Sequence, residues 1–174
     1  MTFENSLKQF SDKYKIGDTI SSHNFFILDL NSILDTTIAL KLGLLDTTGG
    51  YQNYVRLQKE YRCSLVGTFK INSFLVVMTA MYTTGAGDGN PEIKFTTFDE
   101  AGYAQDKLII SLQGIHDPWE QSETRIVITK DFQFNIIDIN NSYDIVNDER
   151  VLLKSSTQRH QKYIIDNNGH FKLN

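Results

Sequence analysis

The sequence contains one cysteine, two prolines and no long apolar run. The single cysteine, Cys63, excludes a disulfide within the chain and any metal site that needs two cysteines of one chain, which favours a reducing compartment. The longest strongly apolar stretch, residues 74–82, is far shorter than the roughly 18 residues that a membrane-spanning helix requires. We therefore expect no membrane span.

Positive charge is not in excess, because 17 Lys and Arg residues accompany 21 Asp and Glu residues and give a net charge of −4. The basic footprint of a nucleic-acid-binding protein is missing, so we expect no direct nucleic-acid partner. Residues 63–122 carry all of the imbalance, with three basic and seven acidic residues. An acidic segment keeps a protein soluble, and it can also complement a basic surface on a partner.

A secretory leader is also missing from the start of the sequence. Residues 1–8 have no basic start followed by an apolar run and a small-residue cleavage site. We expect a cytoplasmic protein. A periplasmic or surface location is the alternative if a leader has been removed.

The length of 174 residues and the 40% hydrophobic fraction predict a single domain, residues 1–174, with its own core. Residues 1–62 form its helix-rich part. Phe3, Leu7, Phe10 and Tyr14 follow helical spacing. Further helical spacing over 32–45 and 51–61, after a short strand at 25–28, predicts two or three N-terminal helices in total.

Residues 63–174 change to a period of two, with Gly-, Asn- and Asp-rich turns between short apolar segments. About eight strands with short connections predict an antiparallel meander, and the apolar segment 74–83 reads as a strand buried on both faces. The whole chain is therefore predicted to be an α+β domain, with the helices packed on one mainly antiparallel, twisted sheet; a closed barrel is the alternative. Five side chains are predicted to be buried: Met78, Phe95, Ile110, Ile128 and Phe134.

Two stretches resemble a β-rich group of bacterial proteins that has no assigned activity. The first, residues 95–108, has an aromatic residue, Asp99, a turn with Gly102, and then Asp106; the second, residues 163–171, ends the chain in a hairpin around Asn167-Asn168-Gly169. The similarity covers roughly residues 65–174 and implies a hairpin-rich fold without an activity. Some members look like secreted lipoproteins, whereas this chain lacks a leader and a lipidated cysteine.

One segment approaches the pattern of a calcium-binding loop. Its candidate ligands occupy positions 1, 3, 5, 7 and 12 of such a loop: Asp138, Asn140, Ser142, Asp144 and Glu149. Tyr143 stands at position 6, where the loop needs glycine, and a strand precedes the segment where a helix is required. A polar connection between strands accounts for the same residues, so we expect no metal site.

No other motif reaches the requirements of an enzyme. The glycine-rich loop at 85–89 has no Lys-Ser/Thr pair and leads into a strand, which argues against phosphate binding. The histidines at 23, 116, 160 and 170 lack metal-ligand spacing, Cys63 reads as an inert thiol, and there is no Gly-x-Ser-x-Gly elbow. We expect neither catalysis nor a cofactor.

These observations favour a non-catalytic binding protein, most concretely an intracellular inhibitor or immunity-type protein that covers a toxin or effector with a basic surface. A carrier of small apolar ligands is the alternative, suggested by 11 Phe and 8 Tyr, and an unrecognised enzyme is the third possibility. The predicted partner-binding residues are six carboxylates and one aromatic anchor: Asp88, Glu92, Asp99, Glu100, Asp117, Trp119 and Glu120.

Overall fold

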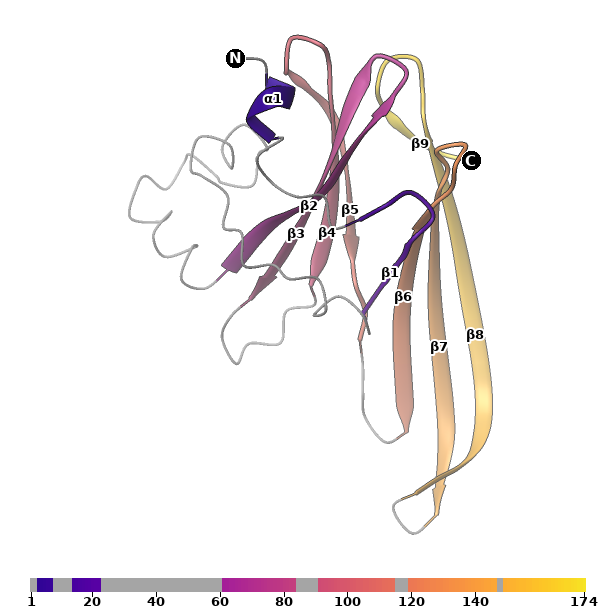
Figure 1. Ribbon diagram of the computed structural model, residues 1–174. Helices are drawn as coiled ribbons and strands as arrows, with labels where there is room; N and C mark the ends of the chain where they lie inside the picture. The colour runs from indigo at the N-terminus through magenta and orange to yellow at the C-terminus, as the bar shows by residue number, and fades with distance from the viewer. Residues whose placement is uncertain (1–2, 8–13, 23–60, 84–90, 115–118, 147–148) are drawn as a thin grey trace.

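The computed structural model describes residues 3–7, 14–22, 61–83, 91–114, 119–146 and 149–174 (Figure 1). These residues form one short helix and nine strands. The elements are α1 (Phe3–Leu7), β1 (Thr19–Ser21), β2 (Tyr61–Ile71), β3 (Phe74–Thr83), β4 (Glu92–Phe98), β5 (Ala104–Ser111), β6 (Glu120–Ile128), β7 (Phe134–Val146), β8 (Glu149–Ile165) and β9 (Phe171–Leu173).

The predicted α+β class is wrong, because the described residues are almost entirely β. Of the first predicted helix, the structure describes Phe3–Leu7 as helical, in α1, and residues 8–13 lie outside the described residues. Tyr14 shares the helical spacing but is held by tertiary contacts: its amide donates to the Val66 carbonyl of β2 at 3.0 Å, and its buried hydroxyl accepts from the Ile128 amide of β6 at 3.0 Å. The strand predicted at 25–28, the helix predicted over 32–45 and residues 51–60 of the helix predicted over 51–61 lie outside the described residues. Tyr61, the last residue of that predicted helix, begins β2 instead.

The strands form two sheets where the sequence predicted one, and every described pairing is antiparallel. The smaller sheet has the order β2-β3-β4-β5, and the larger sheet has the order β1-β6-β7-β8-β9. The single-sheet prediction fails because β2 to β5 form one sheet, whereas β6 to β9 join β1 in the other. Local alternation specifies strands but does not specify which sheet each strand joins.

The core lies between the two sheets and contains side chains from both. All five predicted core residues are buried, with exposed fractions of 7% or less. Phe134 of β7 is at the centre of an aromatic group, since its ring lies 5.2 Å from Phe95, 5.3 Å from Phe171 and 6.2 Å from Phe69, measured between centroids. β3 is buried on both faces from Phe74 to Ala80, as its continuous apolar sequence predicts.

Three hairpins use the same five-residue turn, over residues 99–103, 129–133 and 166–170. In each turn the first residue's amide donates to the carbonyl of the fifth residue, and the fourth residue's amide donates back to the first carbonyl. The fourth residue has a positive φ: 86° at Gly102, 57° at Phe132 and 83° at Gly169. The side-chain oxygen of the first residue accepts the fifth amide, which explains Asp or Thr at that position.

The two stretches that carry the family resemblance meet in space. The Thr97 hydroxyl of β4 donates to the Gly169 carbonyl at 2.6 Å, and the Asp106 carboxylate of β5 accepts the Phe171 amide at 2.8 Å. The β8–β9 hairpin of the larger sheet is thereby fastened to the smaller sheet. These residues therefore have a structural role in holding the sheets together.

The third turn gives stability that depends on pH. The Lys172 ammonium, 2.9 Å from the Asp166 carboxylate, together with the His170 amide, lowers the pKa of Asp166 from 3.8 to about 2. A lowered folded-state pKa stabilises the fold above the unfolded-state pKa, and this stabilisation is lost as the pH falls from about 3.8 to about 2. We expect Asp166→Asn to lower stability at neutral pH and to flatten this acid dependence. Urea unfolding across the acid range checks this, and parallel curves for the two proteins would contradict it.

Candidate functional site

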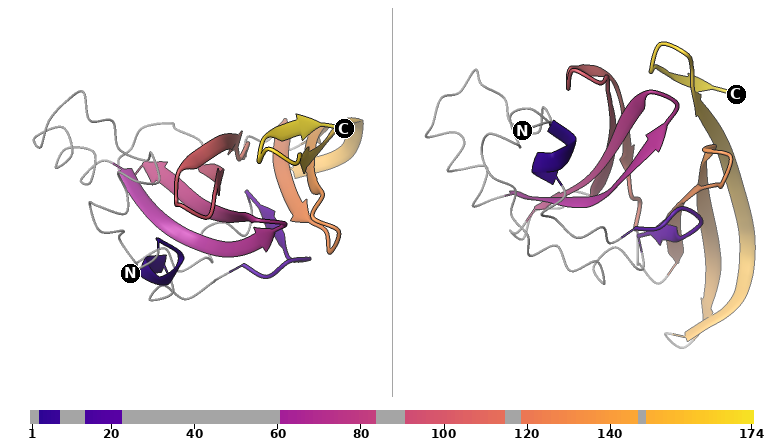
Figure 2. Two further views of the ribbon diagram at one scale, coloured as in Figure 1. Left: turned by 90° about the horizontal axis from the view of Figure 1, so that it is seen from above. Right: turned by 45° about the horizontal axis from the view of Figure 1, so that its top comes forward.

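The larger sheet extends beyond the smaller one at the lower end of Figure 1 and in the right-hand view of Figure 2. We call this part the sheet extension; it comprises residues 119–124 near and in β6, 138–144 of β7 and 153–160 of β8. No described strand of the smaller sheet pairs with it. Its two faces differ in chemistry, and both are accessible in part.

The inner face of the sheet extension is a continuation of the sheet surface that faces the core. Its side chains are polar, whereas those that face the core are apolar. Ile126 and Ile136 are paired and buried in the core. Toward the end of the sheet, the Thr124 hydroxyl donates to Asp138 at 2.8 Å and the Ser122 hydroxyl donates to Asn140 at 2.6 Å. The face is therefore built as a ladder of hydrogen-bonded pairs across neighbouring strands.

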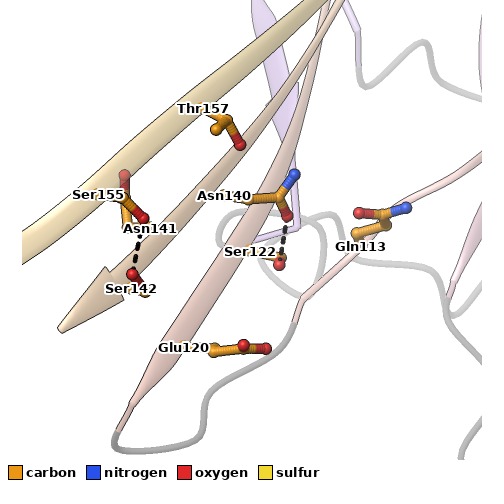
Figure 3. Close-up of a pocket in the computed structure, with 8 residues that line it drawn as sticks. All are labelled: Gln113, Glu120, Ser122, Asn140, Asn141, Ser142, Ser155 and Thr157. Carbon is orange, nitrogen blue, oxygen red and sulfur yellow. Dashed lines mark hydrogen bonds between the residues drawn. The ribbon is translucent and has the colours of Figure 1, made fainter.

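This polar face borders a hollow of about 510 Å³, shown in Figure 3. The lining consists of hydroxyl, amide and carboxylate side chains: Gln113, Glu120, Ser122, Asn140, Asn141, Ser142, Ser155 and Thr157. Ser142 and Ser155 share a hydrogen bond of 2.7 Å, so part of the lining is already paired. Within this lining, Glu120 is the one ionisable residue. The hollow therefore offers neutral hydrogen-bonding groups rather than a nucleophile beside a base.

The outer face carries an apolar group that we call the outer patch, in which Trp119 and Leu153 are exposed and Tyr143 is half-buried. The Tyr143 amide donates to the Trp119 carbonyl at 2.8 Å, and Tyr143 is the register partner of Leu153. The Tyr143 hydroxyl donates to the Gln121 side chain at 3.2 Å, which places Tyr143 on the face opposite Glu120 and Ser122. Trp119 is 60% exposed and Leu153 is 51% exposed. β7, β8 and the residue that precedes β6 thus place these three residues next to one another.

The structure does not bring the predicted partner-binding residues together. Asp99 and Glu100 lie in the β4–β5 turn, whereas Trp119 and Glu120 lie at the start of β6, at the opposite end of the molecule (Figure 1). Glu92 is the first residue of β4. Asp88 and Asp117 lie outside the described residues. Partner binding by these residues stays a prediction.

Asp99 has a structural role in addition. Its carboxylate accepts the Tyr103 amide at 2.8 Å and the Gln105 side-chain amide at 2.9 Å. These bonds close the β4–β5 turn. A change at Asp99 would therefore alter the hairpin as well as the surface charge, and it is a poor position at which to test binding.

The candidate calcium ligands lie in strands. Asp138, Asn140, Ser142 and Asp144 alternate along β7, and Glu149 begins β8. Extended residues two apart are about 6.6 Å apart along a strand, whereas a calcium loop curls its ligands around one ion. Asp144 also forms an ion pair with Lys154 at 3.4 Å. The described residues include no cluster of three or more His, Cys, Asp or Glu side chains placed to hold a metal.

We expect millimolar calcium to leave the melting temperature unchanged, because the strand cannot wrap these oxygens around an ion without breaking its pairing with β6 and β8. Calorimetry with calcium and with chelator checks this. A calcium-dependent rise in melting temperature that Asp138→Ala removes would show the expectation to be wrong.

The remaining sequence motifs form no described site. Cys63 lies in β2, His160 lies in β8, and His170 lies in the last hairpin with its Nδ1 3.8 Å from Asp106. The glycine-rich loop at 85–89, His23 and His116 lie outside the described residues. In the part of the chain that the structure describes, no helix is long and apolar enough to cross a membrane.

Comparison with known proteins found no matching family model, no matching curated protein and no matching solved structure. The fold and the candidate surfaces therefore stand on the residues described above.

Sequence reasoning singled out Trp119 but missed the surface that contains it. Tyr143 entered only as the residue that breaks a calcium loop, and Leu153 only as part of a strand. The signal was the alternation along 138–144, in which Asp138, Asn140 and Ser142 fall on one face and Ile139 and Tyr143 on the other.

Proposed function

We propose that this protein is a non-catalytic binding protein that contacts a partner protein through the outer patch. The observation that carries the proposal is the placement of Trp119, just before β6, beside Tyr143 of β7 and Leu153 of β8, in a part of the sheet with no second layer of described strands. Exposed aromatic and aliphatic side chains that lie together are typical of interaction surfaces. An inhibitor or immunity-type protein that covers a toxin or effector fits this arrangement.

The shape of the surface also supports a protein partner. Residues in adjacent strands are held by the main-chain ladder, so the patch is rigid before binding and loses little conformational entropy in a complex. Tryptophan and tyrosine are the residues that most often dominate binding energy. The polar side chain of Gln121, which accepts a hydrogen bond from the Tyr143 hydroxyl, borders the patch.

The alternative function, a carrier of small apolar ligands, receives less support. The described hollow is lined by polar side chains, which do not suit an apolar ligand. The phenylalanines that suggested a carrier pack in the core against one another, with Phe69, Phe95 and Phe171 around Phe134 and with Phe132 stacked on Phe69 at 6.3 Å.

We expect Trp119→Ala to weaken partner binding by about 2 kcal/mol or more, which is roughly 30-fold, mainly through faster dissociation. Cross-linking in cells of the source organism would identify proteins held by the wild type, and surface plasmon resonance with the purified partner would measure the rates. Tyr103→Ala is the matched control, because Tyr103 is 72% exposed but lies in the β4–β5 hairpin.

The comparison of the two variants decides the proposal. It is supported if the partner dissociates faster from Trp119→Ala and from Leu153→Ser while Tyr103→Ala keeps the wild-type rates. Equal binding by the wild type and both patch variants would refute it.

A further inference from the structure

Among the described residues, no strand pairs with the outward edge of β8 along most of its length. β8 pairs with β7 from Glu149 to Tyr163, whereas its pairing with β9 covers only residues 163–165, extended by one bond from the Asn174 amide to the Lys162 carbonyl at 2.7 Å. Residues 153–160 are all exposed. No other described strand lies against this edge.

The hydrogen bonds fix which main-chain groups point outward. In an antiparallel strand the N–H and C=O of one residue point to the same side, and the side alternates from residue to residue. The Lys162 carbonyl and the Asp166 amide both bond toward the β9 side. The N–H and C=O groups of Ser156, Gln158 and His160 therefore also point to the β9 side, and we call these groups the free edge. The N–H and C=O groups of Ser155, Thr157 and Arg159 point toward β7.

The charge of β8 is opposite to that of the protein as a whole. Its sequence contains Arg150, Lys154, Arg159 and Lys162 against Glu149 alone, in a chain of net charge −4. Arg159 is exposed and forms no ion pair with another described residue. A second copy of β8 would place like charges beside one another, which disfavours self-pairing. A strand that carries carboxylates is attracted by the same charges.

We propose that the free edge is completed by an extended acidic segment of the partner protein, which adds a strand beside β8 in line with β9. This proposal rests on the proposed function and specifies how the partner binds. Main-chain hydrogen bonds to Ser156, Gln158 and His160 supply affinity, and Arg159 selects carboxylate side chains. Leu153 lies on the same strand, so the outer patch and the free edge form one continuous surface.

Amide hydrogen exchange measured by NMR tests the edge directly. In the full chain alone, the amides of Ser156, Gln158 and His160 exchange fast, while those of Ser155, Thr157 and Arg159 are protected by β7. A ten-residue alternating Glu-Thr peptide at millimolar concentration slows exchange of the first three amides by about tenfold or more, and a Lys-Thr peptide does not. No added protection, or equal protection by both peptides, overturns the proposal. Protection that rises with protein concentration alone makes a second copy the occupant and also overturns it.

Gln158→Pro is the variant that blocks strand addition at the free edge while leaving β8 folded. It removes an amide that points away from β7, and proline is tolerated at edge positions of this kind. Gln158→Ala is the matched control, since it keeps the amide. We expect the proline variant to lose peptide binding and partner binding, and the alanine variant to keep both. If the partner is lost from Trp119→Ala but binds Gln158→Pro as it binds the wild type, the strand-addition proposal fails and the proposed function stands.

Discussion

Phe134→Ala is expected to reduce the free energy of unfolding by about 3–5 kcal/mol. The Phe134 ring is fully buried between the sheets and contacts Phe69, Phe95 and Phe171, so its removal leaves a cavity bordered by aromatic rings from β2, β4 and β9. These rings cannot close the cavity by small shifts, because each belongs to a different strand. Urea unfolding followed by far-ultraviolet circular dichroism measures the effect.

Tyr103→Ala again provides the control, since removal of an exposed ring changes stability by no more than about 0.5 kcal/mol. A loss below about 1 kcal/mol for Phe134→Ala would mean that the sheets do not pack around this residue as described.

Gly169→Ala is expected to cost about 2–5 kcal/mol, because two penalties add. A φ of 83° costs about 1–2 kcal/mol for a residue with a side chain. The new Cβ would also lie 2.8 Å from Cε1 of the buried Phe74 ring, and such overpacking costs about 1–3 kcal/mol.

Gly17→Ala is the control that measures the backbone penalty of a positive φ without the steric penalty of a new contact. Gly17 has a φ of 99°, but no atom lies within 4 Å of a Cβ added there. We expect only the backbone cost of about 1–2 kcal/mol, measured by the same urea unfolding. Equal losses for the two variants would show that Phe74 moves aside and that the last hairpin is less tightly fastened than its contacts indicate.

The sequence predicts the described strands well where a core lies beneath them. β3, β4 and β6 were expected because apolar residues alternate or run continuously, and the turns at Asp99, Thr129 and Asp166 were marked by side chains that accept main-chain amides. β7 and β8 include residues 138–146 and Glu149, which the sequence predicts to be a polar connection between strands. Their outer parts carry Asn, Ser, Thr and Gln on a surface without a core beneath, so they resemble loops in sequence.

The division into two sheets was not predictable from local patterns. It depends on contacts between residues far apart in the chain, such as the Tyr14 hydroxyl accepting from Ile128 and Thr97 donating to Gly169. The same limit applies to the candidate site. Trp119 could be singled out from the sequence as an aromatic residue near a loop. Its neighbours Tyr143 and Leu153 belong to β7 and β8, and the pairing of these two strands includes an irregularity next to Tyr143.

Trp119 is the only tryptophan of the chain, so it reports on the outer patch without interference from other residues of this protein. The most direct measurement labels the protein with 5-fluorotryptophan and follows the single ¹⁹F resonance as the purified partner is added. We expect the resonance to shift in proportion to the fraction of protein in the complex, and the solvent accessibility of the Trp119 side chain to fall. A partner that saturates the protein while this resonance keeps its position and accessibility would contradict the claim that the outer patch is the binding surface.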